Sequence, residues 1–172
     1  MRTWRRALLL ATLATAICSP PLKVSAQSRS LTPERAAAVE DGVRAFTRTV
    51  AHDVTEEGPA AWRKHFADIP SFFMAVDGHL MYSSGAAAMA ANADLVRAIK
   101  HIELHWGDDL RVDPLTADLA VVATTWHEII VLAEGKRLDE GGYFTGIAEY
   151  RGGRWQFRNA HWSSAVPPAA AP

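Results

Sequence analysis

The last strand-like segment of the chain carries the polar groups best suited to acid–base chemistry. Side chains alternate along a β-strand, so one face of the segment 154–163 holds Trp155, Phe157, Asn159, His161 and Ser163. An imidazole titrates near neutral pH, which makes His161 a candidate general acid or base. The alternative is that His161 and Ser163 hydrogen-bond to neighbouring backbone and only close the fold.

Glu128 is a second acid–base candidate, within the apolar segment from Leu119 to Leu132. By alternation it shares a face with Trp126 and with smaller apolar residues. A carboxyl group among apolar walls has a raised pKa and can transfer protons. If Glu128 instead lies near the end of the strand, it is hydrated and behaves as an ordinary surface carboxylate.

Asp77 is the third candidate, and it also has a structural explanation. It precedes Gly78 between two apolar runs, and an Asp-Gly pair in that context is the strongest short signal for a β-hairpin turn. A carboxylate at such a turn either serves the turn alone or takes part in acid–base chemistry.

Two histidines and a glutamate, His101, Glu103 and His105, invite a metal-site interpretation. On an extended strand, residues four apart are separated by about 13 Å, whereas zinc–ligand bonds are about 2 Å long. We therefore expect a solvated polar face and no metal. The sequence also lacks a glycine-rich phosphate loop, a dinucleotide-binding fingerprint and a nucleophile elbow, so no cofactor is expected.

Three helices are predicted in the first half of the chain. Thr32 and Pro33 favour a helix start, and the apolar residues that follow recur at helical steps: Val39, Val43, Phe46, Val50 and Val54. A short second helix around residues 61–66 is expected to end before Pro70. Ser84 can cap a third helix over residues 86–100.

Strand patterns fill the rest of the chain, over residues 102–112, 119–132, 138–150 and 154–163. Short connections such as Gly152-Gly153 favour an antiparallel sheet. Helices followed by strands predict an α+β domain with the helices on one face of that sheet. The segment 119–132 is apolar on both faces, so either a second copy of the protein covers its outer face as a homodimer or the strand is central with tolerated surface valines.

The N-terminal residues 1–26 are typical of a secretory signal peptide. Three arginines precede an uncharged run of 11 residues, shorter than the roughly 20 that cross a membrane, and Val24-Ser25-Ala26 fits a cleavage site. We expect an exported protein, periplasmic or secreted. Residues 27–33 are expected to be a linker and residues 165–172 a disordered Pro/Ala tail.

Loss of the signal peptide changes the charge of the chain. It removes four of the 18 basic residues and none of the 19 acidic ones, which leaves a net charge of −5. This negative charge disfavours nucleic acids and anionic membrane surfaces as partners. The single cysteine, Cys18, is removed as well, so neither thiol catalysis nor a disulfide is expected in the mature chain.

The order of elements resembles the nuclear transport factor 2-like superfamily over about residues 34–164, which would form one domain. The resemblance rests on the three helices, the Asp77-Gly78 hairpin, the segment ADLAVV and the closing segment GYFTGIAEYRGGRWQFRNAHWSS. The end of that segment resembles the polyketide-cyclase-like (SnoaL-like) branch and the association domain of calcium/calmodulin-dependent protein kinase. The resemblance implies a cone-shaped, cystatin-like roll, in which a curved sheet wraps around the helices, leaves a pocket and turns Trp126 and Glu128 inward. Such a likeness predicts fold far better than activity.

Three functions remain open for such a domain. In the first, an exported domain binds a small apolar or amphipathic molecule through residues that line its pocket: Trp126, Tyr143, Thr145, Phe157, Asn159 and Ser163. In the second, a cofactor-independent isomerase, dehydratase or cyclase uses His161 with Glu128 or Asp77 as acid and base. In the third, the domain serves assembly and its pocket is closed. An enzyme needs two titratable groups that face one cavity, so the placement of His161 relative to Glu128 discriminates among them.

Overall fold

The computed structural model of the chain describes residues 31–165, in which helices come first and strands follow. The predicted signal peptide and most of the predicted tail lie outside these residues. The elements in chain order are α1 (Pro33–Glu57), the 3-10 helix η1 (Gly58–Ala61), α2 (Trp62–His65), β1 (Phe73–Val76), β2 (His79–Tyr82), α3 (Gly85–Ala98), β3 (Ile99–Trp106), β4 (Arg111–Thr116), β5 (Leu119–Leu132), β6 (Arg137–Arg151) and β7 (Arg154–Ser164).

Helix α1 forms where its caps and its apolar spacing predict it. The Thr32 side chain accepts a hydrogen bond from the Arg35 backbone N–H, and Pro33 occupies the first helical turn. The five apolar residues at helical spacing are all buried. Two hydrogen bonds then fix this helix against β3: Trp106 Nε1 donates to the Thr47 carbonyl, and the Leu104 backbone N–H donates to Thr55 Oγ1.

The sheet is mixed, which differs in one strand pair from the antiparallel sheet that the sequence predicts. Its order is β2-β1-β7-β6-β5-β3, and β4 pairs with β5 beside β3. Strand β1 runs parallel to β7, because the chain passes through α3 and five further strands before it returns beside β1. The predicted single strand over 102–112 is likewise divided into β3 and β4, which pair with successive parts of β5.

The predicted hairpin after the second helix is present between β1 and β2. Asp77 and Gly78 both have positive φ angles, 48° and 81°, the backbone that a two-residue turn of matching twist requires. Helix α3 begins after Ser84, whose side chain accepts from the Ala87 backbone N–H, as predicted. Asn92 on α3 donates to the Pro59 carbonyl and so joins α3 to η1.

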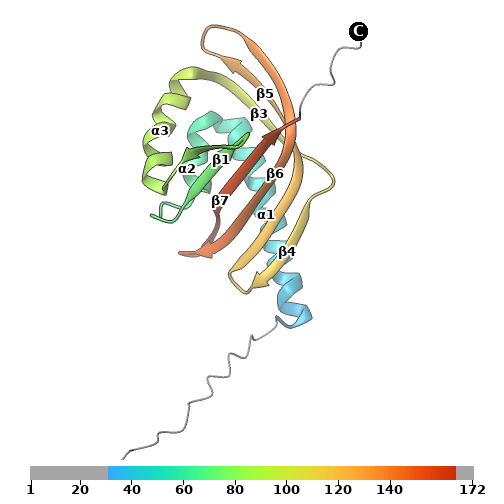
Figure 1. Cartoon of the computed structure of the whole chain (residues 1–172). Helices are drawn as coiled ribbons and strands as arrows, with labels where there is room; N and C mark the ends of the chain where they lie inside the picture. Colours follow the sequence, from blue (N-terminus) through green and yellow to red (C-terminus); the bar gives the residue numbers. More distant parts are fainter. Residues whose placement is uncertain (1–30, 166–172) are drawn as a thin grey trace, which may run out of the picture.

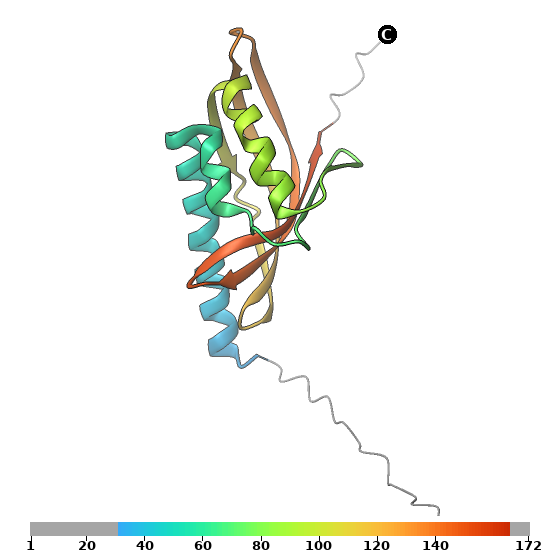
Figure 2. The ribbon, with the colours of Figure 1, turned by 90° about the vertical axis from the view of Figure 1, so that its left-hand side faces the viewer.

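The sheet curves around the helices, as the cone-shaped roll predicts. Figure 1 shows the long strands β5, β6 and β7 bent around α1, α2 and α3, and Figure 2 shows α3 lying in front of the sheet with α1 beside it. The concave side therefore faces the helices, and the convex side is uncovered in the single chain. None of the helices within residues 31–165 is long and apolar enough to cross a membrane.

The convex face of β5 carries the residues from which a homodimer is predicted. Val121, Ala123 and Ile129 are half-buried there, whereas Val122 and Ala120 on the opposite face are fully buried. Association of two copies through this face stays a prediction.

Candidate functional site

A cavity of about 260 Å³ lies between the helices and the concave face of the sheet. Aromatic side chains from α2, from the residue that follows it and from three strands form much of its wall: Trp62, Phe66, Tyr82, Trp126 and Trp162. Aliphatic side chains complete the wall: Met74, Val76, Leu95, Ile99, Ile102 and Ile130. The cavity is therefore predominantly apolar, as small-molecule sites generally are.

Trp162 on β7 is the centre of the aromatic side chains that line the cavity. Its ring lies 5.8 Å from that of Trp62 and 5.3 Å from that of Trp126, both in edge-to-face contact. It also packs on Trp106 at 5.5 Å and on Phe144 at 4.8 Å. Such contacts stabilise aromatic clusters beyond simple burial, so the Trp162 ring supports the base of the cavity as well as lining it.

Glu128 extends into this cavity from β5, on the same face as Trp126 and Ile130. The inward orientation that the resemblance implies is thus present, and Glu128 is half-buried rather than an ordinary surface carboxylate. Burial, and to a smaller extent the nearby charge of Glu140, raise the pKa of Glu128 from 4.5 to about 7. Glu140 is the cross-strand partner of Glu128 on β6 and also lines the cavity.

Asp77 lines the cavity from the β1–β2 turn, so it belongs to both the turn and the site. Its Oδ1 accepts from the Ser164 backbone N–H at 2.6 Å, and its Oδ2 accepts from Ser164 Oγ at 2.9 Å. These hydrogen bonds, with a smaller electrostatic contribution from the nearby imidazoles of His161 and His79, hold the pKa of Asp77 below its usual value. Asp77 is therefore a carboxylate that fixes the end of β7 at the cavity.

His161 does not face the cavity, so the prediction that His161 and Glu128 face one cavity as an acid–base pair is wrong. The residue is exposed and lines a shallow groove on the convex side, together with Asn159 and Thr145. The cause is a β-bulge: Phe157 pairs with Ala148 and Asn159 with Ile147, so Arg158 is an extra residue. One inserted residue reverses which face every later side chain occupies.

The same reversal moves the other predicted ligand residues of β7. Asn159 Oδ1 accepts from the Ile147 backbone N–H at 2.9 Å, beside the bulge. Ser163 donates through Oγ to the Tyr143 carbonyl on the convex side. Neither residue is among those that line the cavity, so their expected ligand contacts are wrong for this cavity.

Of the remaining predicted ligand residues, Trp126 alone lines the cavity. Tyr143 and Thr145 alternate with the buried Phe144 on β6 and are exposed on the convex side. Phe157 is fully buried in the core, with its ring 4.8 Å from Phe46 and 5.0 Å from Phe144. It supports the cavity from below without reaching it.

The sequence analysis misses most of the residues that line the cavity, including Trp162, Ser164 and Glu140. A signal for the first two exists, because the polar alternation Arg154, Gln156, Arg158 is interrupted by an aromatic residue at 162. Such an interruption indicates that an inserted residue has moved the following side chains to the other face. For Glu140 no comparable signal exists, since it lies among other charged residues at the start of β6.

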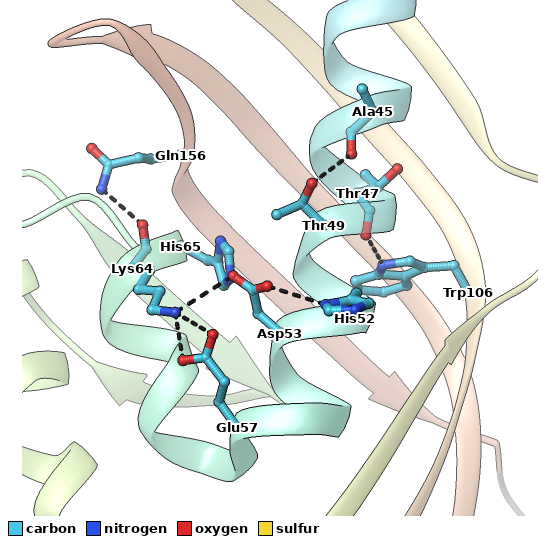
Figure 3. A network of polar contacts seen from close by, with 10 residues as sticks. All are labelled: Ala45, Thr47, Thr49, His52, Asp53, Glu57, Lys64, His65, Trp106 and Gln156. Carbon is cyan, nitrogen blue, oxygen red and sulfur yellow. Dashed lines mark hydrogen bonds and ion pairs between the residues drawn. The ribbon is translucent and has the colours of Figure 1, made fainter.

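A polar network between α1 and α2, in which His65 is buried, forms a second cluster of titratable groups (Figure 3). His65 is only 5% exposed, and its Nε2 lies 3.2 Å from Asp53 Oδ2, without the alignment of a hydrogen bond. Lys64 pairs with both Asp53 and Glu57. Asp53 is therefore largely shielded from solvent, although it lies near the end of α1. Burial outweighs the Asp53 charge and lowers the pKa of His65.

The histidines of β3 lie on the convex side, beside one carboxylate. His101 Nε2 is 2.9 Å from Glu103 Oε1, and His105 Nε2 is 3.9 Å from Glu103 Oε2. Across the strand pair, His105 lies against His127, which contacts Asp139 at 2.7 Å. In the part of the chain that the structure describes, no group of three or more such side chains has a metal-binding arrangement.

Trp126 contributes a polar atom, unpaired among the described residues, to the aromatic wall. Its side chain is 7% exposed, and its indole Nε1 is buried with no hydrogen-bond partner within residues 31–165. A buried donor without an acceptor costs about 1–3 kcal/mol.

Comparisons with known proteins agree with this architecture. No family model matches the sequence, and no curated protein matches it. Among solved structures, a putative scytalone dehydratase from Novosphingobium aromaticivorans is similar with a TM-score of 0.67 at 10% identity, over 82% of this chain and 100% of that one. A putative calcium/calmodulin-dependent protein kinase II association domain from Xanthomonas campestris is similar with a TM-score of 0.60 at 20% identity, over 82% and 95%.

A protein described by its superfamily is also similar. It is a nuclear transport factor 2-like superfamily protein from Salmonella enterica, with a TM-score of 0.61 at 11% identity, over 81% of this chain and 96% of that one. At these identities the likeness concerns the backbone fold and not the reaction. The curved mixed sheet, the helices in its concavity and these neighbours together show that the chain has the nuclear transport factor 2-like fold.

Proposed function

We propose that this protein binds a small, mostly apolar molecule in the cavity between α3 and the concave face of the sheet. The observation that carries the proposal is the cavity itself, about 260 Å³ in volume, with aromatic and aliphatic walls around a few carboxyl groups. Sites for drug-sized ligands measure about 300–1,000 Å³, so the ligand is expected to be smaller than a typical drug. Of the predicted alternatives, an assembly domain would need no such cavity.

Filling the cavity with protein atoms tests the proposal. Val76 on β1 lines the cavity and is half-buried, so Val76→Phe places a ring in the ligand volume. We expect saturation-transfer NMR to detect binding of small neutral molecules such as benzyl alcohol and cyclohexanol to the unmodified protein. The variant is expected to lose at least tenfold in affinity, because its ring excludes the ligand.

The matched control is Val96→Phe, which adds the same ring on α3 at an exposed position away from this cavity. It is expected to leave binding unchanged. Binding of the neutral molecules that survives Val76→Phe would contradict the proposed site.

A second candidate function, cofactor-independent proton transfer, is favoured by the difference between two of the three acidic groups of the cavity, Asp77 and Glu128. The pKa of Asp77 lies below its usual value and that of Glu128 is raised to about 7. Carboxyl groups whose pKa values are moved apart are typical of acid–base sites. His161 has no part in this version of the hypothesis, because it lies on the convex side.

Exchange of carbon-bound hydrogen for deuterium tests this second function. Ionised Glu128 would remove a proton from the carbon next to a carbonyl and return a deuteron from the solvent to the enolate. With cyclohexanone in D₂O at pH 8, we expect Glu128→Gln to lower the protein-catalysed rate by about 10²-fold or more, the usual contribution of a general base. Equal rates for the variant and the unmodified protein would contradict the role, and proton NMR measures both.

A further inference from the structure

The charged groups around the cavity all have one sign. Asp77, Glu128 and Glu140 line it, and its lining within residues 31–165 contains no lysine, arginine or histidine. Tyr82 is the remaining titratable group of the lining, and burial raises its pKa, so it is neutral at physiological pH. An anionic ligand would therefore meet repulsion with no compensating cation.

Glu128 and Glu140 also lack an internal counter-charge. They are direct cross-strand partners on β5 and β6, and neither takes part in an ion pair within the described residues, although other carboxylates such as Glu149 do. Like charges directly opposite each other destabilise a strand pair. A positive charge between the two carboxylates would relieve that repulsion.

The aromatic wall suits the same kind of group. Trp62, Trp126 and Trp162 line the cavity together, with ring centroids 5.3–5.8 Å apart around Trp162. A cation within about 6 Å of an aromatic ring face is attracted by the ring quadrupole, most strongly with tryptophan. Carboxylates placed beside a tryptophan-rich apolar wall thus favour a ligand that is both apolar and positively charged.

We propose that the cavity takes a small hydrophobic ammonium compound, with its apolar part against the tryptophans and its cationic group beside Glu128 and Glu140. This inference rests on the proposed function, since it specifies the class of ligand for the same cavity. The alternative is a neutral ligand, in which case the carboxylates are hydrated and contribute nothing to selectivity.

Three probes of similar shape and different charge separate these cases. They are benzyltrimethylammonium, its neutral carbon isostere neopentylbenzene, and the anion phenylacetate, titrated calorimetrically at pH 8 in one buffer. We expect the cation to bind at least tenfold more tightly than the neutral isostere, and the anion to bind most weakly. Glu128→Gln is expected to remove most of the preference for the cation and to leave affinity for neopentylbenzene unchanged or improved.

The matched control is Glu103→Gln, which removes one negative charge from the convex side of β3. It is expected to keep the preference for the cation. If long-range charge alone attracted the cation, this variant would weaken binding as much as Glu128→Gln, and that result would overturn the inference.

The pH dependence gives an independent readout. A quaternary ammonium does not titrate, and the pKa of Glu128 is about 7, so affinity for the cation is expected to rise about tenfold from pH 5.5 to pH 8 as the carboxyl ionises. Glu128→Gln is expected to remove this rise. Equal binding of the cation and the neutral isostere would overturn the inference and leave the proposed function standing, whereas failure of both probes to bind would overturn both.

Discussion

Replacing Trp162 with alanine is expected to destabilise the protein by about 3–5 kcal/mol, the usual cost of removing a large buried aromatic side chain. Its ring contacts four other aromatic rings, contributed by α2, β3, β5 and β6. Truncation removes all four contacts at once and leaves a void that these rigid elements cannot close. Urea denaturation followed by far-ultraviolet circular dichroism measures the effect.

Trp155→Ala is the matched control on the same strand. Trp155 is half-buried, and its one aromatic contact in the described residues is Tyr150, at 5.4 Å. It is expected to cost about 1–2 kcal/mol, because less apolar surface is lost from the core. An equal cost for the two variants would show that Trp162 does not organise the aromatic cluster.

A small aromatic molecule provides a second test of the same variant. An engineered apolar cavity can bind a ligand of matching shape, and binding to the native state raises stability in proportion to the logarithm of ligand concentration. Indole is expected to raise the melting temperature of Trp162→Ala and to have a smaller effect on Trp155→Ala. A variant that is merely misfolded would show no such recovery.

Glu128→Gln is expected to raise the free energy of unfolding at pH 8, and this gain over the unmodified protein is expected to exceed the one at pH 4.5 by up to about 3 kcal/mol. The pKa rises from 4.5 in the unfolded chain to about 7 in the native state, and each pKa unit corresponds to about 1.4 kcal/mol. Between these values the native state binds more protons than the unfolded state, so stability falls as pH rises from 4.5 to 7. The glutamine variant lacks this loss. Urea unfolding at several pH values measures the difference.

His65 acts in the opposite direction over an overlapping range of pH. In the native state, burial lowers the pKa of His65 below the value of 6.5 that it has in the unfolded chain. The unfolded chain therefore binds the proton more readily. Stability therefore falls as pH drops below 6.5. In the unmodified protein the effects of Glu128 and His65 on the pH dependence of stability partly cancel. In Glu128→Gln only the effect of His65 remains of these two, so the stability of the variant is expected to rise with pH.

Glu140→Gln is the control for the pH measurement. Its charge is the second cause of the raised pKa of Glu128, after burial. The variant is therefore expected to change the pH dependence in the same direction and by a smaller amount. A larger effect for Glu140→Gln than for Glu128→Gln would contradict burial as the main cause.

The sequence predicts most elements of the fold because their signals are local. The spacing of Val39, Val43 and Phe46 defines the buried face of α1, and Ser84 caps α3, as the structure confirms. The Asp77-Gly78 pair predicts the hairpin because few residues tolerate its positive φ angles. Which strands become neighbours is a non-local property, and the parallel pairing of β1 with β7 was not predicted.

The candidate site is predictable only where strand alternation is unbroken. On β5 no register shift separates Trp126 from Glu128, so both occupy the cavity as expected. On β7 a single extra residue, Arg158, exchanges the two faces and places Trp162 inside and His161 outside. Alternation has a period of two, so one inserted residue is enough to invert the assignment of every position after it.

Local pattern thus determined that this chain forms helices followed by a sheet and that Trp126 and Glu128 share one face of a strand, because caps, turns and apolar periods act within a few residues of one another. Only the tertiary structure decided which polar groups share the cavity. The bulge on β7, the pairing of β5 with β6 that brings Glu140 beside Glu128, and the contact of Asp77 with Ser164 all join residues distant in the sequence. Their positions depend on the packing of the whole sheet around the helices, and no short segment carries that information.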